Sequence, residues 1–240
     1  NGCNVLFIDI AHGHHVLLKK VIKELKDEFG ENVEVIGGSI ATKEATKDLC
    51  EWGVDGLRVG VGNGSLCETR IRTGVGLPSV TALLDVCSTA DDYNVPVIAD
   101  GGIRNVGDVC KGLGSGADTI MVGSLLSGTK ESPGTIEKKG QWPNEQLFKK
   151  YRGSASLDSK SDRGETHNIE GYSTVVTYKG KVKRIINDIP AVIGNFDLTF
   201  CEIWYDGEKV DSLNKEGILK KEGELREEYA ISFHPIVTIH

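Results

Sequence analysis

The sequence VDGLRVGVGNGSLC at residues 54–67 joins an apolar, strand-like segment to a glycine-rich loop that ends in a cysteine. Glycines alternate through this loop, so the chain can bend sharply as it leaves the strand. The bend also leaves backbone N–H and C=O groups open to a ligand or an ion. Cys67, at the end of the loop, is a candidate nucleophile; the alternative is a small buried cysteine beside an ordinary turn.

The same pattern of an apolar strand closed by Asp or Gly recurs on both sides of this segment. Strands are predicted at residues 5–9, 33–36, 54–59, 95–100 and 118–122, and helices at 16–29, 42–52, 80–93 and 106–113. In the first helix, Leu17, Val21, Leu25 and Phe29 are spaced by four and predict its buried stripe. Alternating strands and helices predict an α/β fold with a parallel sheet, whose carboxyl edge binds ligands.

Polar or glycine-rich ends on every unit favour a barrel over an open sheet. A (β/α)₈ TIM barrel takes about 250 residues, so five βα units predict a partial barrel without its first three units. Residues 1–194 form this predicted partial barrel, and residues 195–240 form a β-rich tail that we expect to be a separate small element. Residues 127–162 are predicted to be a long loop. Beyond it the pattern predicts strands at 172–178, 196–205 and 231–239 and a helix at 182–189.

Composition narrows the class of protein. Hydrophobic residues make up 39% and charged residues 26%, as in ordinary globular proteins. The net charge of -7 argues against nucleic acid as a partner, and no apolar run is long enough to suggest a membrane partner. The six cysteines lack the paired spacing of a zinc site, which favours a reducing, cytoplasmic location.

Two strand ends carry groups suited to a nucleotide. Gly101 and Gly102 follow Asp100, and Ser124 follows Gly123, so backbone N–H groups there could bind a phosphate. Asp100 could accept hydrogen bonds from a ribose diol. Tight turns that simply require glycine are the alternative at both places.

The chain resembles the IMP dehydrogenase / GMP reductase family of (β/α)₈ barrels over about residues 3–193. The similar segments are GVGNGSLCETR at 60–70, TGVGLPS at 73–79, VPVIADGGIRNVGDV at 95–109, MVGSLLSGTKESPG at 121–134 and YRGSASLD at 151–158. They occur in the family's order. The resemblance implies an oxidoreductase in which a loop cysteine forms a covalent adduct at purine C2.

The resemblance also implies a role for each matching residue. The implied catalytic residues are Cys67, Thr69, Glu170 and Arg163. The implied substrate-binding residues are Ser65, Asp100, Gly101, Gly102, Gly123, Ser124, Tyr151 and Gly153. Asp9, Ala11 and His12 would bind the nicotinamide cofactor, NADPH or NAD. Backbone carbonyls of Gly62, Gly64 and Cys67 would bind a potassium ion.

The two branches of the family differ in how the adduct is resolved, and the sequence departs from both. Arg163 is followed by Gly164 instead of the tyrosine of the dehydrogenase flap, and residues 72–76 are more typical of the reductase. We therefore expect GMP reductase, which converts GMP and NADPH to IMP and ammonia. The alternatives are IMP dehydrogenase, which converts IMP and NAD to XMP, and an inactive or split barrel fragment that binds nucleotide. The expected partners are GMP or IMP, and either a homotetramer or a chain that supplies the first barrel units.

Overall fold

The computed structural model describes residues 3–165, 167, 169–185, 203–205, 210–212 and 237–239. The strands in chain order are β1 (Val5–Asp9), β2 (Glu34–Ile40), β3 (Gly56–Val59), β4 (Val97–Asp100), β5 (Thr119–Met121), β6 (Ile136–Lys139), β7 (Gln146–Arg152), β8 (Ser173–Thr177), β9 (Ile203–Tyr205), β10 (Val210–Ser212) and β11 (Val237–Ile239). The helices are α1 (Val16–Phe29), α2 (Lys43–Trp52), α3 (Thr69–Thr73), α4 (Ser79–Ala90), α5 (Val106–Gly114) and α6 (Leu157–Asp162), with short 3₁₀ helices η1 (Gly30–Asn32) and η2 (Asp91–Tyr93).

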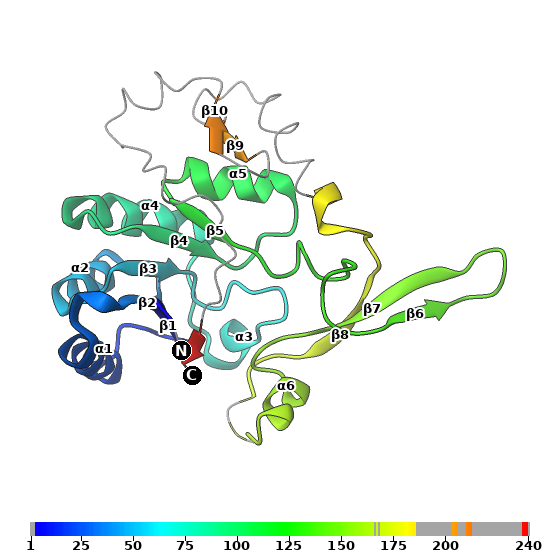
Figure 1. Cartoon of the computed structure of the whole chain (residues 1–240), viewed down its shortest axis with the longest axis horizontal. Coiled ribbons are helices and arrows are strands. Elements are labelled where there is room, and N and C mark those ends of the chain that lie inside the picture. Colours follow the sequence, from blue (N-terminus) through cyan, green and yellow to red (C-terminus); the bar gives the residue numbers. More distant parts are fainter. Residues whose placement is uncertain are drawn as a thin grey trace.

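The strands of the five predicted βα units, β1 to β5, form a parallel sheet that β11 of the tail extends, in the order β11-β1-β2-β3-β4-β5 (Figure 1). This confirms the parallel α/β class. β5 and β11 lie at opposite edges of the sheet, so the sheet is open within the described residues and no closed barrel is seen there. Because all its strands run the same way, the ends of β1, β3, β4 and β5 meet at one carboxyl edge.

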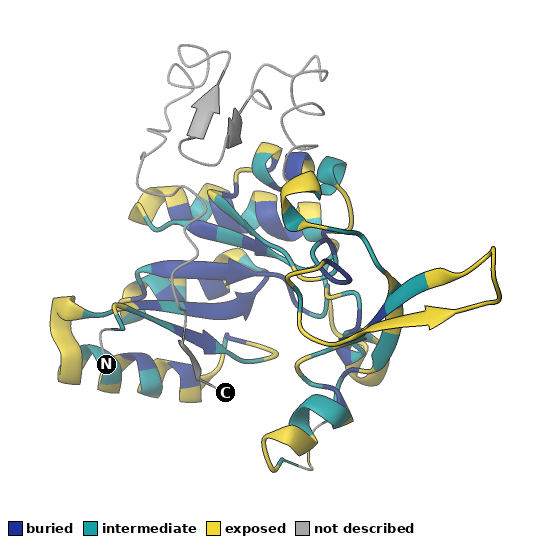
Figure 2. Cartoon of the chain, turned by 45° about the vertical axis from the view of Figure 1, so that its right-hand side comes forward, coloured by how far each residue is buried: buried dark blue, intermediate teal, exposed yellow. Residues whose placement is uncertain are grey.

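Helices α1, α2 and α4 pack on the main sheet through one apolar core, and the central strands of this sheet are among the most buried parts of the chain (Figure 2). Leu49 of α2 and Leu57 of β3 are both fully buried in it. The α2 helix begins where the Thr42 hydroxyl accepts a hydrogen bond from the Ala45 N–H.

The predicted stripe of α1 was wrong by one position. Leu17 is 63% exposed, and Phe29 lies at the exposed end of the helix, whereas Leu18 and Ile22 are the fully buried residues. Val21 and Leu25 pack against the core only in part. An α-helix repeats every 3.6 residues, so side chains spaced by four do not stay on one face of the helix. The face that packs on the sheet is instead centred on Leu18 and Ile22.

The long loop predicted at residues 127–162 was also wrong. This stretch contains β6, β7 and α6, and β6, β7 and β8 form an antiparallel sheet that projects from the main body (Figure 1). Every residue of β6 is exposed, so its strand follows from backbone pairing with β7 and leaves no apolar pattern in the sequence. The following strand, predicted at 172–178, is confirmed as β8.

Only short parts of the tail lie within the described residues. β9 and β10 form an antiparallel pair, and β11 pairs in parallel with β1. Part of the tail therefore joins the main sheet, although the sequence indicated a separate element. The remaining residues of the strands predicted at 196–205 and 231–239, and those after residue 185 in the helix predicted at 182–189, lie outside the described residues.

Candidate functional site

Cys67 lies at the start of a hydrogen-bonded chain of three side chains at the carboxyl edge of the sheet. Its Sγ is 3.1 Å from the Thr69 hydroxyl oxygen, and that hydroxyl donates to Glu170 Oε2 at 2.7 Å. Thr69 is buried, so this contact is shielded from water. A thiol joined to a carboxylate through a hydroxyl can lose its proton without a histidine, which is the arrangement that an activated nucleophile needs.

Backbone pairing holds Glu170 next to the cysteine loop, although 101 residues separate Thr69 from Glu170. The Glu68 N–H donates to the Glu170 carbonyl at 2.8 Å, and Cys67 forms an antiparallel bridge with Gly171. A Cβ on Gly171 would lie 3.0 Å from the Leu66 carbonyl oxygen, so glycine permits this close approach. The Glu170 side chain is thus placed by main-chain contacts that do not depend on a ligand.

The cysteine loop packs directly on the turn that follows β4. Gly101 has a φ of +86°, and a Cβ there would lie 2.7 Å from the Asn63 side chain. A Cβ on Gly60 would lie 2.1 Å from the Asp100 carbonyl oxygen. Glycine at both positions therefore lets the two loops touch, which brings Asp100 to the same edge as Cys67.

The predicted phosphate-binding residues come together beside this contact. The Ser65 hydroxyl donates to Ser124 Oγ at 3.1 Å, and Ser124 donates to the Ile103 carbonyl at 3.1 Å. A Cβ on Gly123 would lie 3.2 Å from the Tyr151 hydroxyl oxygen. Burial, together with the charge of Asp100, raises the pKa of Tyr151, so its phenol stays a neutral hydrogen-bond donor.

A buried arginine that sequence reasoning missed connects the two carboxylates of the site. Arg58 of β3 donates to Asp9 and, at 2.6 Å, to Ser39 Oγ, and its guanidinium is 3.4 Å from Asp100 Oδ2. Arg58 Nε has no partner among the described residues. Burial raises the pKa of Asp100, and the charge of Arg58 opposes that rise. The visible sequence signal was a charged residue inside an apolar strand.

The predicted cofactor residues lie at the end of β1, which Asp9 closes, and in the loop after it. Asp9 holds Arg58 through Oδ1 alone and its side chain is 27% exposed, which leaves carboxylate surface for a ribose hydroxyl. Ala11 and His12 are exposed in the loop that follows. The neighbouring His14 is engaged by Asp48 at 2.8 Å. Within the described ranges, no group of three or more His, Cys, Asp and Glu side chains is placed to hold a metal ion.

Two further predicted residues lie on the segment after β7. The Gly153 N–H donates to the Tyr172 carbonyl at 3.2 Å, and a Cβ on Gly153 would lie 3.3 Å from Leu66, so Gly153 borders the cysteine loop. Arg163 donates to Glu165 at 3.1 Å and to the Ser154 carbonyl at 2.9 Å. The structure thus directs the Arg163 guanidinium to these two partners and not to the Cys67 thiol.

The loop proposed for potassium already surrounds a cationic side chain. Arg70 donates to the Val61 carbonyl at 3.0 Å and also to Asn63, and a Cβ on Gly62 would lie 2.7 Å from the Arg70 side chain. The Gly64 carbonyl accepts the Cys67 N–H at 3.1 Å and keeps a second lone pair. Backbone carbonyl oxygens are the usual ligands of potassium in proteins, so the carbonyls of this loop are chemically suited to bind it.

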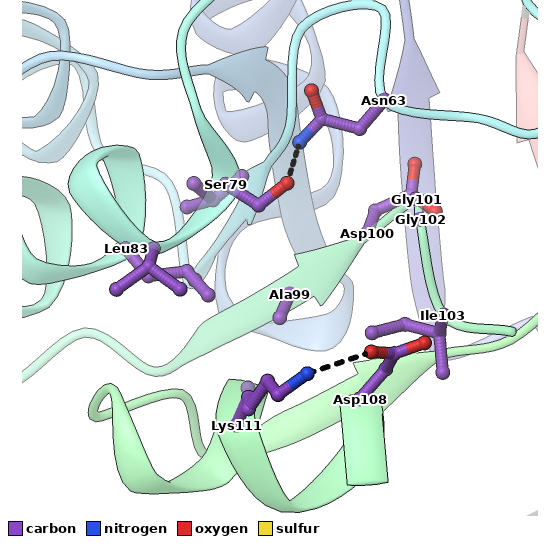
Figure 3. Close-up of a pocket in the computed structure, with 13 residues that line it drawn as sticks. Asn63, Ser79, Leu83, Ala99, Asp100, Gly101, Gly102, Ile103, Asp108 and Lys111 are labelled. Carbon is purple, nitrogen blue, oxygen red and sulfur yellow. Dashed lines mark hydrogen bonds and ion pairs between the residues drawn. The ribbon is translucent and has the colours of Figure 1, made fainter. Parts of the chain in front are cut away.

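A cavity of about 160 Å³ lies on the helix side of the Asp100–Gly102 turn, between α4 and α5 (Figure 3). Asn63 donates to Ser79 at 3.0 Å on one wall, and Lys111 contacts Asp108 at 3.3 Å on another. Cys67 does not line this cavity. The cavity therefore borders the glycine turn from behind and is distinct from the thiol site.

The fold and site together define a class: an α/β protein in which a loop cysteine, hydrogen-bonded through a hydroxyl to a carboxylate, lies beside glycine-rich turns at the carboxyl edge of a parallel sheet. Residues 1–197 match the family described as the IMP dehydrogenase / GMP reductase domain, and the chain belongs to that family.

Among the helices of the described residues, none is long and apolar enough to cross a bilayer.

Relatives from distant organisms are similar over most of this chain. It is 41% identical to an inosine-5'-monophosphate dehydrogenase of Nitrosopumilus maritimus (strain SCM1), over 83% of this chain and 44% of the relative. It is 42% identical to one of Aquifex aeolicus (strain VF5), over 77% of this chain and 39% of the relative. It is 46% identical to one of Mycobacterium leprae (strain TN), over 68% of this chain and 30% of the relative.

The chain thus spans less than half the length of these relatives. All three carry the dehydrogenase name, so the sequence-based preference for GMP reductase gains no support from them.

Proposed function

We propose that this chain supplies the nucleotide-binding and cysteine-bearing part of an IMP dehydrogenase, which converts IMP, NAD and water to XMP and NADH. The observation that carries the proposal is the chain from the Cys67 thiol through Thr69 to Glu170, with contacts of 3.1 and 2.7 Å. The names of the relatives favour this reaction over that of GMP reductase.

The chain's own groups suit both halves of this chemistry. In the first half, Cys67 Sγ bonds to purine C2, and its proton passes through the Thr69 hydroxyl to Glu170. NAD, when bound, supplies the acceptor for the hydride that leaves C2. Glu170 then releases the thiol proton to solvent and is again a carboxylate. In the second half, water attacks C2 and gives one proton to Glu170 along the same path, while its other proton stays with the purine product. The C2–S bond breaks, and the departing thiolate takes the proton back from Glu170.

Binding would place the nucleotide along the carboxyl edge. Ser65, Ser124 and Tyr151 would hold the phosphate, and Asp100 would accept hydrogen bonds from the ribose. Asp9 would face the ribose of NAD. The carbonyls of Gly62, Gly64 and Cys67 would hold potassium, which would stiffen the loop that carries the thiol. Residues 1–194 would form the catalytic unit, and residues 195–240 would be an additional part of the chain.

A direct test offers the full chain IMP with NAD, and separately GMP with NADPH, and follows absorbance of the reduced nicotinamide. We expect turnover only with IMP and NAD. Turnover with GMP and NADPH alone would assign the chain to the reductase branch. Nucleotide binding with neither turnover would support a split barrel, and the assay would then be repeated with a co-expressed polypeptide carrying the missing units.

The thiol chemistry can be tested even where NAD does not bind. The probe is 2-chloro-IMP, the IMP analogue with chlorine on C2. Attack by the thiolate forms the S–C2 bond and expels chloride, so no oxidant is needed. The product is the same Cys67–C2 adduct that water hydrolyses in the second half, so XMP and chloride should form without NAD. Cys67 should be labelled in samples quenched early with acid, and IMP should protect it by competition.

A further inference from the structure

Lys179 follows β8 and reaches the turn that carries Ser124. Its Nζ donates to the Ser124 carbonyl at 2.7 Å and to the Leu125 carbonyl at 3.1 Å. Among the described residues, no carboxylate lies within ion-pair distance of this ammonium group. Lys179 is half-buried, and this burial lowers the pKa of its ammonium group.

The backbone around Lys179 reinforces this attachment. The Lys179 N–H donates to the Gly128 carbonyl at 2.8 Å, and the Lys130 N–H donates to the Gly180 carbonyl at 2.7 Å. A second lysine of the same sheet, the buried Lys149, donates to the Thr129 carbonyl at 3.0 Å. The β7–β8 sheet is therefore fastened to the segment after β5 by two cations and a short backbone ladder.

The hydrogen bond from Lys179 to the Ser124 carbonyl fixes the orientation of the peptide between Ser124 and Leu125. In a trans peptide, the carbonyl of one residue and the N–H of the next point in opposite directions. Because Lys179 holds the Ser124 carbonyl, the Leu125 N–H points away from the lysine. A cation on the carbonyl also polarises the amide and strengthens the N–H as a donor to an anion on the other side.

The same short segment connects both ends of the candidate site. Glu170 lies just before β8 and contacts Thr69, and Lys179 lies just after β8 and contacts the Ser124 turn. We propose that Lys179 is a positioning residue for the phosphate of a purine nucleoside monophosphate, and that it couples phosphate binding at the Ser124 turn to the segment that carries Glu170. This inference rests on the proposed nucleotide site.

The experiment compares the affinities of the full chain for IMP and for inosine, which lacks only the phosphate, by calorimetry. Lys179→Met should weaken IMP binding about tenfold to a hundredfold, the loss expected for a hydrogen bond to a charged group, and leave inosine binding within about twofold. Lys179→Arg should restore most of the IMP affinity. Lys183→Met, at an exposed lysine nearby, is the matched control and should change neither affinity.

Equal losses for IMP and inosine would show a merely structural role and overturn the inference, as would an unchanged IMP affinity. Lys179→Gln replaces the Met variant if the latter fails to fold. Hydrogen exchange gives a second readout: IMP should protect residues 170–180 in the wild type and not in the variant. Wild-type protein that binds IMP no more tightly than inosine would contradict the proposed function itself, and the inference with it.

Discussion

Removing the Thr69 hydroxyl should slow the chemistry of Cys67 as much as removing the Glu170 charge, and removing both should cost no more than either. The Thr69–Glu170 contact of 2.7 Å is a hydrogen bond to a charged group. Such bonds contribute about 1.5–3 kcal/mol, or roughly 10- to 100-fold in rate. Thr69→Val keeps the shape of the buried side chain, and Glu170→Gln keeps that of the carboxylate.

The assay measures the rate constant for thioether formation between Cys67 and 2-chloro-IMP at saturating probe. If the proton passes through Thr69 to Glu170, the single variants and the double variant should all be slower by the same factor of about 10 to 100. Effects that multiply in the double variant, to roughly 100- to 10,000-fold, would mean that the two residues act independently and would refute the proton path.

Three further outcomes follow from burial and backbone geometry. Burial raises the pKa of Cys50 to about 11 and that of Cys87 to about 12. Near pH 8, therefore, only about 0.1% of Cys50 and about 0.01% of Cys87 is thiolate, the form that iodoacetamide alkylates. Mass spectrometry should find both residues unlabelled at pH 8, with labelling rising as the pH approaches each pKa. Gly101→Ala places a methyl group 2.7 Å from Asn63 at a φ of +86° and should lower the free energy of unfolding by about 1–3 kcal/mol in a urea titration. Leu49→Ala, at a side chain with no exposed surface, should lower it by about 2–5 kcal/mol; a loss below about 1 kcal/mol would contradict the packing described.

Much of the sheet could be predicted because each of its strands is a local apolar run in the sequence. The five strands of the barrel-like part are short apolar runs, and β1, β3, β4 and β5 lie within or at the runs that predict them; β2, predicted at 33–36, instead continues through Gly37 and Gly38 to Ile40. The close spacing of Cys67 and Thr69 already allowed contact between them. Gly101 follows a strand directly, so its role in a tight turn was visible from the sequence.

Other features depend on contacts between distant parts of the chain. Arg58 looked like an exception within an apolar strand, because its partners lie on other strands: Asp100 on the neighbouring β4, and Asp9 on β1, beyond β2. Glu170 could be connected to Thr69 only through resemblance to a family, since no local pattern joins residues 101 positions apart. β6 was missed because its exposed residues are held by pairing with β7, which leaves no hydrophobic periodicity.

The central claim, that Cys67 attacks purine C2, is tested most directly by peptide mass spectrometry of the full chain after incubation with 2-chloro-IMP. In samples quenched with acid during early turnover, we predict one adduct equal in mass to the probe less hydrogen chloride, located on Cys67, blocked by IMP and absent in Cys67→Ser. An adduct on any other cysteine would contradict the claim, as would a bound probe that gives neither an adduct nor released chloride.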